Sequence, residues 1–334
     1  MKPNLSIACA ATLLCFSFVL PGDQVRFAVK EKSRIAKVFE EKSVLHSTSI
    51  SASFDGEEQE AEGVKLTLED SSRVEITDEY GALKEGKPAR LTRTYDKLGG
   101  KSLQKVELPE GMSAGEGPDA EKERSSELEG KTVVFKLSDE GDEYKAAFAD
   151  DKGDAELLEG LEEDMDLRGF LPSGEVAEDK SWEIAPKVFN DVLGTPGGDL
   201  KLKTADDKDD DKIDEQIRDN LKGKAKGTYK GQRDVGGHKC AVIALEAELE
   251  TKAKDDKSGA GEGEGLNEIE LGFTIEGELL WDVEAGHFRK CALSTQIKMS
   301  WKQTMTGSEG GEKHELVQSF EFEGQSEFSA TIGD

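Results

Sequence analysis

The sequence predicts an α+β protein, built as a curved antiparallel sheet or open barrel of long strands with a few helices packed against it. Three observations predict this class. Apolar and polar residues alternate with a period of two over long stretches of the second half of the chain. The same alternation recurs, less regularly, in the first half. Apolar residues at helical spacing gather only between residues 155 and 193. A period of two is typical of a strand with one buried face.

An apolar run at the start of the chain, residues 5–20, predicts a secretory signal peptide. A lysine precedes the run, and Pro21 and Gly22 break it. The run is shorter than the ~20 residues that a membrane-spanning helix needs. We therefore expect cleavage after residues 1–22 and a secreted or periplasmic protein with no membrane span. An uncleaved N-terminal anchor is the alternative.

The first half of the exported chain predicts short strands, and the middle predicts helices. The strand-like segments are residues 47–54, 64–68, 73–76, 89–95, 131–137 and 144–148. Helical spacing appears at residues 155–166 and again at residues 185–193, where Pro186 lies near a first turn and Gly194 is a stop signal. Residues 25–42 are interpreted as an amphipathic lead-in.

The clearest strand follows in the second half, from Ile269 to Val283, where every second residue is apolar or glycine and most of the others are acidic or Thr. Such a strand would be about 50 Å long if straight, at ~3.3 Å per residue. We therefore expect it to coil, or to bend at Gly272 or Gly277. Its neighbours alternate in the same way, so residues 226–332 predict about five antiparallel strands joined by hairpins.

Three low-complexity segments, residues 110–127, 204–215 and 252–265, predict solvated acidic loops. We interpret residues 23–334 as a single β-rich domain that carries these loops as insertions, because the strand sets on either side are alike. A split into two domains near residues 204–222 is the alternative.

The composition limits the partners. The chain has 44 Lys and Arg against 72 Asp and Glu, a formal net charge of -28. This charge argues against nucleic acid, because phosphate binding needs clustered basic residues, and it disfavours anionic membrane surfaces. It permits a cationic partner, divalent metal ions or an apolar ligand.

No complete set of motifs for catalysis or cofactor binding is present. The P-loop and C-x-x-C motifs are absent. A G-x-S-x-G match at residues 111–115 lies in a Gly- and Glu-rich low-complexity segment, and an S-x-x-K match at residues 102–105 comes without the S-D-N and K-T-G motifs that accompany it in enzymes. Asp207, Asp209 and Asp211 resemble the start of a calcium loop, but Lys212 and Arg218 occupy the positions of its glycine and glutamate. We therefore predict no catalytic, cofactor-binding or metal residues and no cofactor.

Two cysteines, Cys240 and Cys291, remain after signal cleavage. In an oxidising compartment an isolated pair predicts one disulfide. Alternation places the two on different strand faces, so the bridge would require a bulge or a pairing between layers. The alternatives are two free buried thiols and a Cys2His2 zinc site completed by His238 and His287.

A family resemblance rests on three segments. Residues 227–250 combine Y-x-G, a glycine-rich turn and a Cys-bearing strand, and residues 276–300 contain G-x-L-x-W-D-x-x-x-G-x-F. With residues 171–184, they resemble uncharacterised secreted bacterial proteins of the planctomycete type. This resemblance covers about half of the chain and implies no activity. By analogy of fold alone, the architecture is also similar to the open barrels of periplasmic lipoprotein carriers.

These observations favour an exported, non-enzymatic binding or structural protein. Its long apolar strand faces need to be buried against another apolar surface, so we expect an apolar ligand or a partner within the concave sheet. A hydrolase that uses a pair of carboxylates is the alternative.

Overall fold

The computed structural model describes residues 25–109, 120–141, 143–204, 211–255, 264–309 and 312–333. The predicted signal peptide, residues 1–22, lies outside these ranges. So do Asp207 and Asp209 of the predicted acidic loop.

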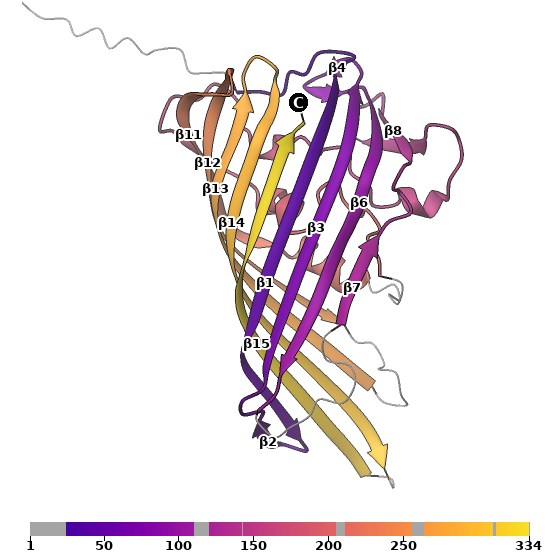
Figure 1. Ribbon diagram of the computed structural model, residues 1–334, viewed down its shortest axis with the longest axis vertical. Helices are drawn as coiled ribbons and strands as arrows, with labels where there is room; N and C mark the ends of the chain where they lie inside the picture. Colours follow the sequence, from indigo (N-terminus) through magenta and orange to yellow (C-terminus); the bar gives the residue numbers. More distant parts are fainter. Residues whose placement is uncertain are drawn as a thin grey trace, which may run out of the picture.

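Strands make up most of the described structure (Figure 1). They are β1 (Arg34–Phe54), β2 (Glu57–Glu60), β3 (Lys65–Tyr80), β4 (Leu83–Lys84), β5 (Lys87–Pro88), β6 (Arg90–Glu107), β7 (Ala120–Ser125), β8 (Thr132–Leu137), β9 (Tyr144–Phe148), β10 (Ser181–Glu183), β11 (Lys222–Val235), β12 (His238–Asp255), β13 (Glu264–Asp282), β14 (His287–Glu309) and β15 (Glu312–Ile332). The helices are the 3-10 turns η1 (Ala155–Leu158), η2 (Arg168–Phe170) and η3 (Pro186–Phe189), with α1 (Asn190–Leu193) and α2 (Asp211–Asp219).

The prediction of an α+β fold was wrong. Within the described residues α1 has four residues and α2 has nine, and the rest of the regular structure is almost entirely antiparallel sheet. The segment 155–166 forms only η1, because Gly160 turns into the left-handed conformation at φ +76° and ends the helical path. Residues 25–33 have no regular structure, and the rest of the predicted lead-in belongs to β1.

A single sheet of 13 strands has the order β10-β11-β12-β13-β14-β15-β1-β3-β6-β8-β9, with β2 and β7 pairing to β1 and β6. The strands before and after residues 204–222 belong to this one sheet, because β15 pairs with β1 over most of its length. Five of the strands, β11 to β15, lie where residues 226–332 predicted about five strands. No helix of the described residues has the length and apolarity that crossing a membrane requires.

The sheet is strongly coiled, so that β13, β14 and β15 run obliquely to β1, β3 and β6 at the end that carries β2 (Figure 1). Coiling brings neighbouring backbones together at Gly277, where a Cβ would lie 2.1 Å from the Ala292 carbonyl oxygen. At Gly272 a Cβ would meet nothing within 4 Å. Of the two predicted bend positions, only Gly277 is therefore required to be glycine.

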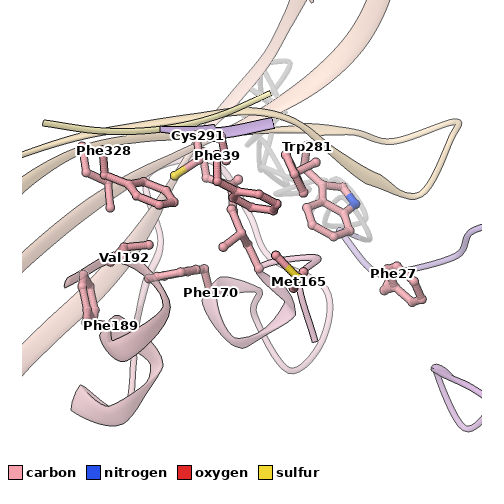
Figure 2. Close-up of a cluster of buried hydrophobic side chains, with 14 of the residues drawn as sticks. Phe27, Phe39, Met165, Phe170, Phe189, Val192, Trp281, Cys291 and Phe328 are labelled. Atoms are coloured by element: carbon pink, nitrogen blue, oxygen red, sulfur yellow. The ribbon is translucent and has the colours of Figure 1, made fainter. Parts of the chain in front are cut away.

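One face of the sheet, the inner face, is covered over half of its length by residues 149–204, the covering segment. This segment lies behind the upper half of the sheet in Figure 1. Figure 2 shows its side chains, Phe170 and Phe189 among them, opposite Phe39 and Phe328 of the sheet. Each buried side chain of this size stabilises the fold by about 1.5–3 kcal/mol.

Buried charges fix the covering segment to the sheet. Lys37 Nζ lies 2.7 Å from both Asp78 Oδ2 and Asp166 Oδ1, and all three side chains are fully buried. Arg93 donates to Asp78 and to the carbonyl oxygens of residues 162–163. Because Asp166 and residues 162–163 belong to the covering segment, this network sets its position on the sheet.

The predicted Cys240–Cys291 disulfide is not formed, and both thiols are free and buried. Cys291 is part of the inner-face core. Cys240 lies on the opposite, outer face, in a small cluster with Val242 and Leu280. Strand β13 lies between β12 and β14, so the two thiols are separated by one strand as well as by the sheet itself.

The predicted acidic loops include residues that belong to strands or to a helix. Residues 120–125 form β7, and residues 252–255 and 264–265 belong to β12 and β13. Residues 211–215 begin α2, which lies beside the part of β12 that extends past β11. There the Gln216 amide donates to the Lys254 carbonyl oxygen at 2.9 Å and accepts from its N–H at 3.0 Å. The Gln216 side chain thus forms the backbone hydrogen bonds that the edge of β12 would otherwise leave unpaired.

Candidate functional site

The inner face continues beyond the covering segment toward the end of the sheet that carries β2. We call this part the open face. Strand register places its side chains in three rows across the sheet. The rows are Phe273, Ile297, Gly324, Leu45 and Leu68; then Leu271, Met299, Phe322 and Ser47; then Ala253, Ile269, Trp301, Phe320 and Ile50.

Aromatic side chains form the centre of the open face. The Trp301 and Phe320 rings stack at 5.0 Å between centroids, and Phe320 stacks on Phe322 at 6.4 Å. Phe322 is buried, whereas Trp301 and Phe320 remain half-buried. Trp281 of β13 lies in the core under the covering segment. Trp301 is therefore the tryptophan that presents its indole to the open face.

Polar rows bound the apolar rows at both ends. Toward the covering segment the register aligns Thr295, Ser326, Ser43, Asp70 and Ser102. At the far end it aligns Asn267, Gln303 and Gln318. Thr295 and Gln303 are eight residues apart along β14, which corresponds to about 26 Å of strand. The open face is therefore an apolar band with a polar group at each end.

The outer face of the same strands is different, because it carries charged ladders. Lys298 lies 3.1 Å from Glu323, and Lys254 lies 3.4 Å from Glu268. These side chains are largely solvent-exposed. In this half of the sheet the inner face is thus mainly apolar and the outer face mainly charged and polar.

Three charged residues lie at the end of the open face nearest the covering segment. Arg124 of β7 pairs with Asp70 of β3 and donates to the Ser71 carbonyl oxygen at 3.3 Å. Ser326 donates to Glu41 of β1 at 3.3 Å. Burial, together with the nearby Asp70 charge, raises the pKa of Glu41 to about 7. Burial also raises the pKa of Asp70, although Arg124 opposes that shift.

Gly100 allows Arg124 to reach this position. The two residues pair between β6 and β7, and the guanidinium lies across the glycine. A Cβ at Gly100 would lie 3.2 Å from Arg124 Nη2 and 2.6 Å from the Ser71 carbonyl oxygen. Any larger residue would displace the Arg124 side chain from Asp70.

An acidic pocket of about 530 Å³ adjoins the same arginine, between the covering segment and α2. Its acidic lining residues are Glu162, Asp191, Asp199, Asp214, Glu215 and Asp219, against Arg124 and Arg218. Burial, with Asp164 and Glu162 nearby, raises the pKa of Asp191 to about 8. Anionic molecules would be repelled from this end of the open face.

A pocket of about 850 Å³ lies elsewhere, along β10 to β13. Two charged residues on its lining, Lys226 and Glu246, are paired across strands at 3.0 Å. It has no convergent set of groups comparable to the end of the open face, so we do not place the site there.

The residues considered for zinc do not come together. His238 is bonded to Asp282 at 2.7 Å, and Cys240 and Cys291 lie on opposite faces. Within the described ranges no three His, Cys, Asp or Glu side chains are arranged to hold a metal ion. Sequence reasoning missed Glu41, and its only signal was an acid two residues after the apolar Phe39 on an alternating strand.

Comparisons with known proteins do not identify a family. No protein-family model matches the chain, and no curated protein matches it. The planctomycete-type resemblance therefore finds no support. A solved structure, the crystal structure of Acinetobacter baumannii OccAB4, aligns over 90% of this chain and 98% of its own, with 10% identity and a TM-score of 0.19. A likeness at that TM-score carries no argument about fold or function.

Proposed function

We propose that this protein is an exported, non-enzymatic binding protein whose open face holds one elongated apolar ligand, such as the acyl chain of a lipid. The observation that carries the proposal is the set of apolar rows, which continue the core face beyond the covering segment and whose members, apart from the buried Ala253 and Phe322, are half-buried. Export is supported by the apolar run at residues 5–20.

The shape and energetics of the open face suit a chain-like ligand. A contiguous exposed apolar patch on a soluble protein commonly marks an interaction site. Covering roughly 300 Å² of apolar surface would favour binding by about 7 kcal/mol at ~25 cal/mol per Å², before the entropic cost of association is subtracted. A favourable free energy of about 7 kcal/mol alone corresponds to a dissociation constant of about 10 μM, so the actual affinity is weaker than that, which suits reversible binding.

The carboxylate-based hydrolase is supported less well. Glu41 and Asp70 are the two carboxyls at the end of the open face, but Asp70 is held in an ion pair by Arg124. A hydrolytic pair needs both carboxyls available, one as acid and one as base or nucleophile. The cluster is better suited to orienting a polar group than to cleaving a bond.

Binding of an apolar fluorescent dye, N-phenyl-1-naphthylamine, tests the proposal with a matched pair of variants. Met299→Glu places a charge on the open face, and Lys298→Glu changes the neighbouring residue on the outer face. We expect Met299→Glu to weaken dye binding at least tenfold, and Lys298→Glu to change it less than twofold. Thermal denaturation of both variants checks that they are folded. Absence of dye binding to the native protein, or equal weakening in the two folded variants, would contradict the proposal.

A further inference from the structure

We propose that the ligand of the open face is a cationic amphiphile, and that the Glu41 carboxylate pairs with its ammonium head group. This inference rests on the function proposed above and specifies its substrate class.

Glu41 lies where a head group would be placed. Its strand, β1, also supplies Leu45 to the first apolar row, four residues further along. That separation is about 13 Å along the strand. A chain that crosses the three apolar rows, parallel to the strands and with its polar end toward the covering segment, therefore brings that end to Glu41.

The charges around Glu41 favour a cation. The groups that act on it are Asp70 from β3, Arg124 from β7 and Ser326 from β15. Arg124 forms its ion pair with Asp70, and Glu41 forms no ion pair within the described part of the chain. The cluster thus carries one excess negative charge when Glu41 is ionised. The acidic pocket beyond Arg124 adds further negative charge, so the field along the approach also attracts cations.

Proton linkage gives this pairing a recognisable signature. Because burial raises the pKa of Glu41 to about 7, much of the residue is protonated in the free protein near neutral pH. A bound ammonium group favours the ionised form and lowers that pKa, so binding releases a proton. Affinity for an amine should rise as pH rises from 6 to 8. Affinity for an uncharged ligand of the same length should not rise.

Three ligands with one chain length test the inference: dodecylamine, dodecanol and dodecanoate, each competing with the bound dye at pH 6 and pH 8. At pH 8 we expect the amine to bind at least tenfold more tightly than the alcohol, and dodecanoate to bind most weakly. Glu41→Gln should remove the preference for the amine and its pH dependence, while affinity for dodecanol stays within twofold. Glu40→Gln, on the outer face of the same strand, is the matched control and should keep the preference.

The outcomes separate the two proposals. If dodecanol or dodecanoate binds as tightly as the amine, the head-group inference is wrong and the apolar-ligand function stands. If Glu41→Gln weakens the amine and the alcohol equally, the residue acts only on structure, and the inference is overturned. If none of the three displaces the dye and no direct binding is detected, the proposed function itself fails.

Discussion

At the scale of single residues, the fold depends on a few charged side chains that face inward. Lys37 lies on the inner face of β1 between two carboxylates, Asp78 of β3 and Asp166 of the covering segment. Burying such charges is costly unless each is paired. Removing one partner therefore leaves an uncompensated charge rather than merely a lost contact.

Lys37→Met should destabilise the protein by about 3–5 kcal/mol, the usual cost of breaking a buried ion pair by removing one partner. Lys42→Met, an exposed position on the same strand, should change stability by less than about 0.5 kcal/mol. Urea denaturation of the native protein and both variants measures the difference. Equal stability of the Lys37 variant and the native protein would show that the network does not anchor the covering segment.

Acid should weaken the same network. Burial alone would raise the pKa of Asp78, but Arg93 and Lys37 outweigh burial and hold that pKa below its ordinary value of 3.8. A carboxyl with a depressed folded-state pKa contributes stability that is present above the unfolded-state pKa and is lost as pH falls through the folded-state pKa. The contribution of Asp78 is therefore complete near neutral pH and disappears only below about pH 4.

At the scale of secondary structure, coiling of the sheet explains why one glycine of β13 is required and another is not. Gly277 faces the Ala292 carbonyl oxygen so closely that any Cβ would force the strands apart, whereas Gly272 has free space. The sequence alone could not distinguish the two, because both interrupt the same alternating pattern.

Gly277→Ala should therefore destabilise the protein by about 1–3 kcal/mol, the range typical of overpacking. Gly272→Ala should be neutral or slightly stabilising, because alanine reduces the entropy of the unfolded chain. Thermal unfolding of the two single variants, compared side by side, measures this contrast. Similar melting temperatures for the two variants would show that the strands are not in close contact at Gly277.

Strands β11 to β15 could be predicted because their alternation is local and nearly uninterrupted. The first thirteen residues of β1 could not, because Lys37 and Glu41 occupy inward positions where the pattern calls for apolar residues. The partner that justifies Lys37, Asp78, is 41 residues away. Residues 155–166 show helical spacing but form only the short η1, because their leucines pack against the sheet from a mostly irregular segment. Here a local pattern was present without the regular structure that it predicted.

The candidate site was predictable only in part. The alternation in residues 226–332 is enough to put Trp301 and Phe320 on the apolar faces of their strands, and that interpretation needs no distant contact. It could not show that the covering segment ends before reaching them. Glu41, Asp70 and Arg124 come together only through the registers of β1 with β3 and of β6 with β7, and no local pattern carries that information.

At the scale of the whole molecule, the two halves of one inner face serve different purposes. The half under the covering segment is a closed core anchored by buried ion pairs. The half toward β2 presents apolar rows bounded by polar ones, while the outer face of the same strands carries charged ladders. The open face is therefore the surface on which the proposed binding function depends.

Fluorescence of Trp301 is the most direct test of that account. The chain has three tryptophans; Trp281 is fully buried in the core, and Trp182 lies within the covering segment, where its indole N–H donates to the Phe170 carbonyl oxygen. Titration with a dodecyl chain brominated at its middle carbons should quench the native protein and the Trp182→Phe variant, and leave Trp301→Phe almost unquenched. Quenching that persists undiminished in Trp301→Phe would place the ligand elsewhere and contradict binding along the open face.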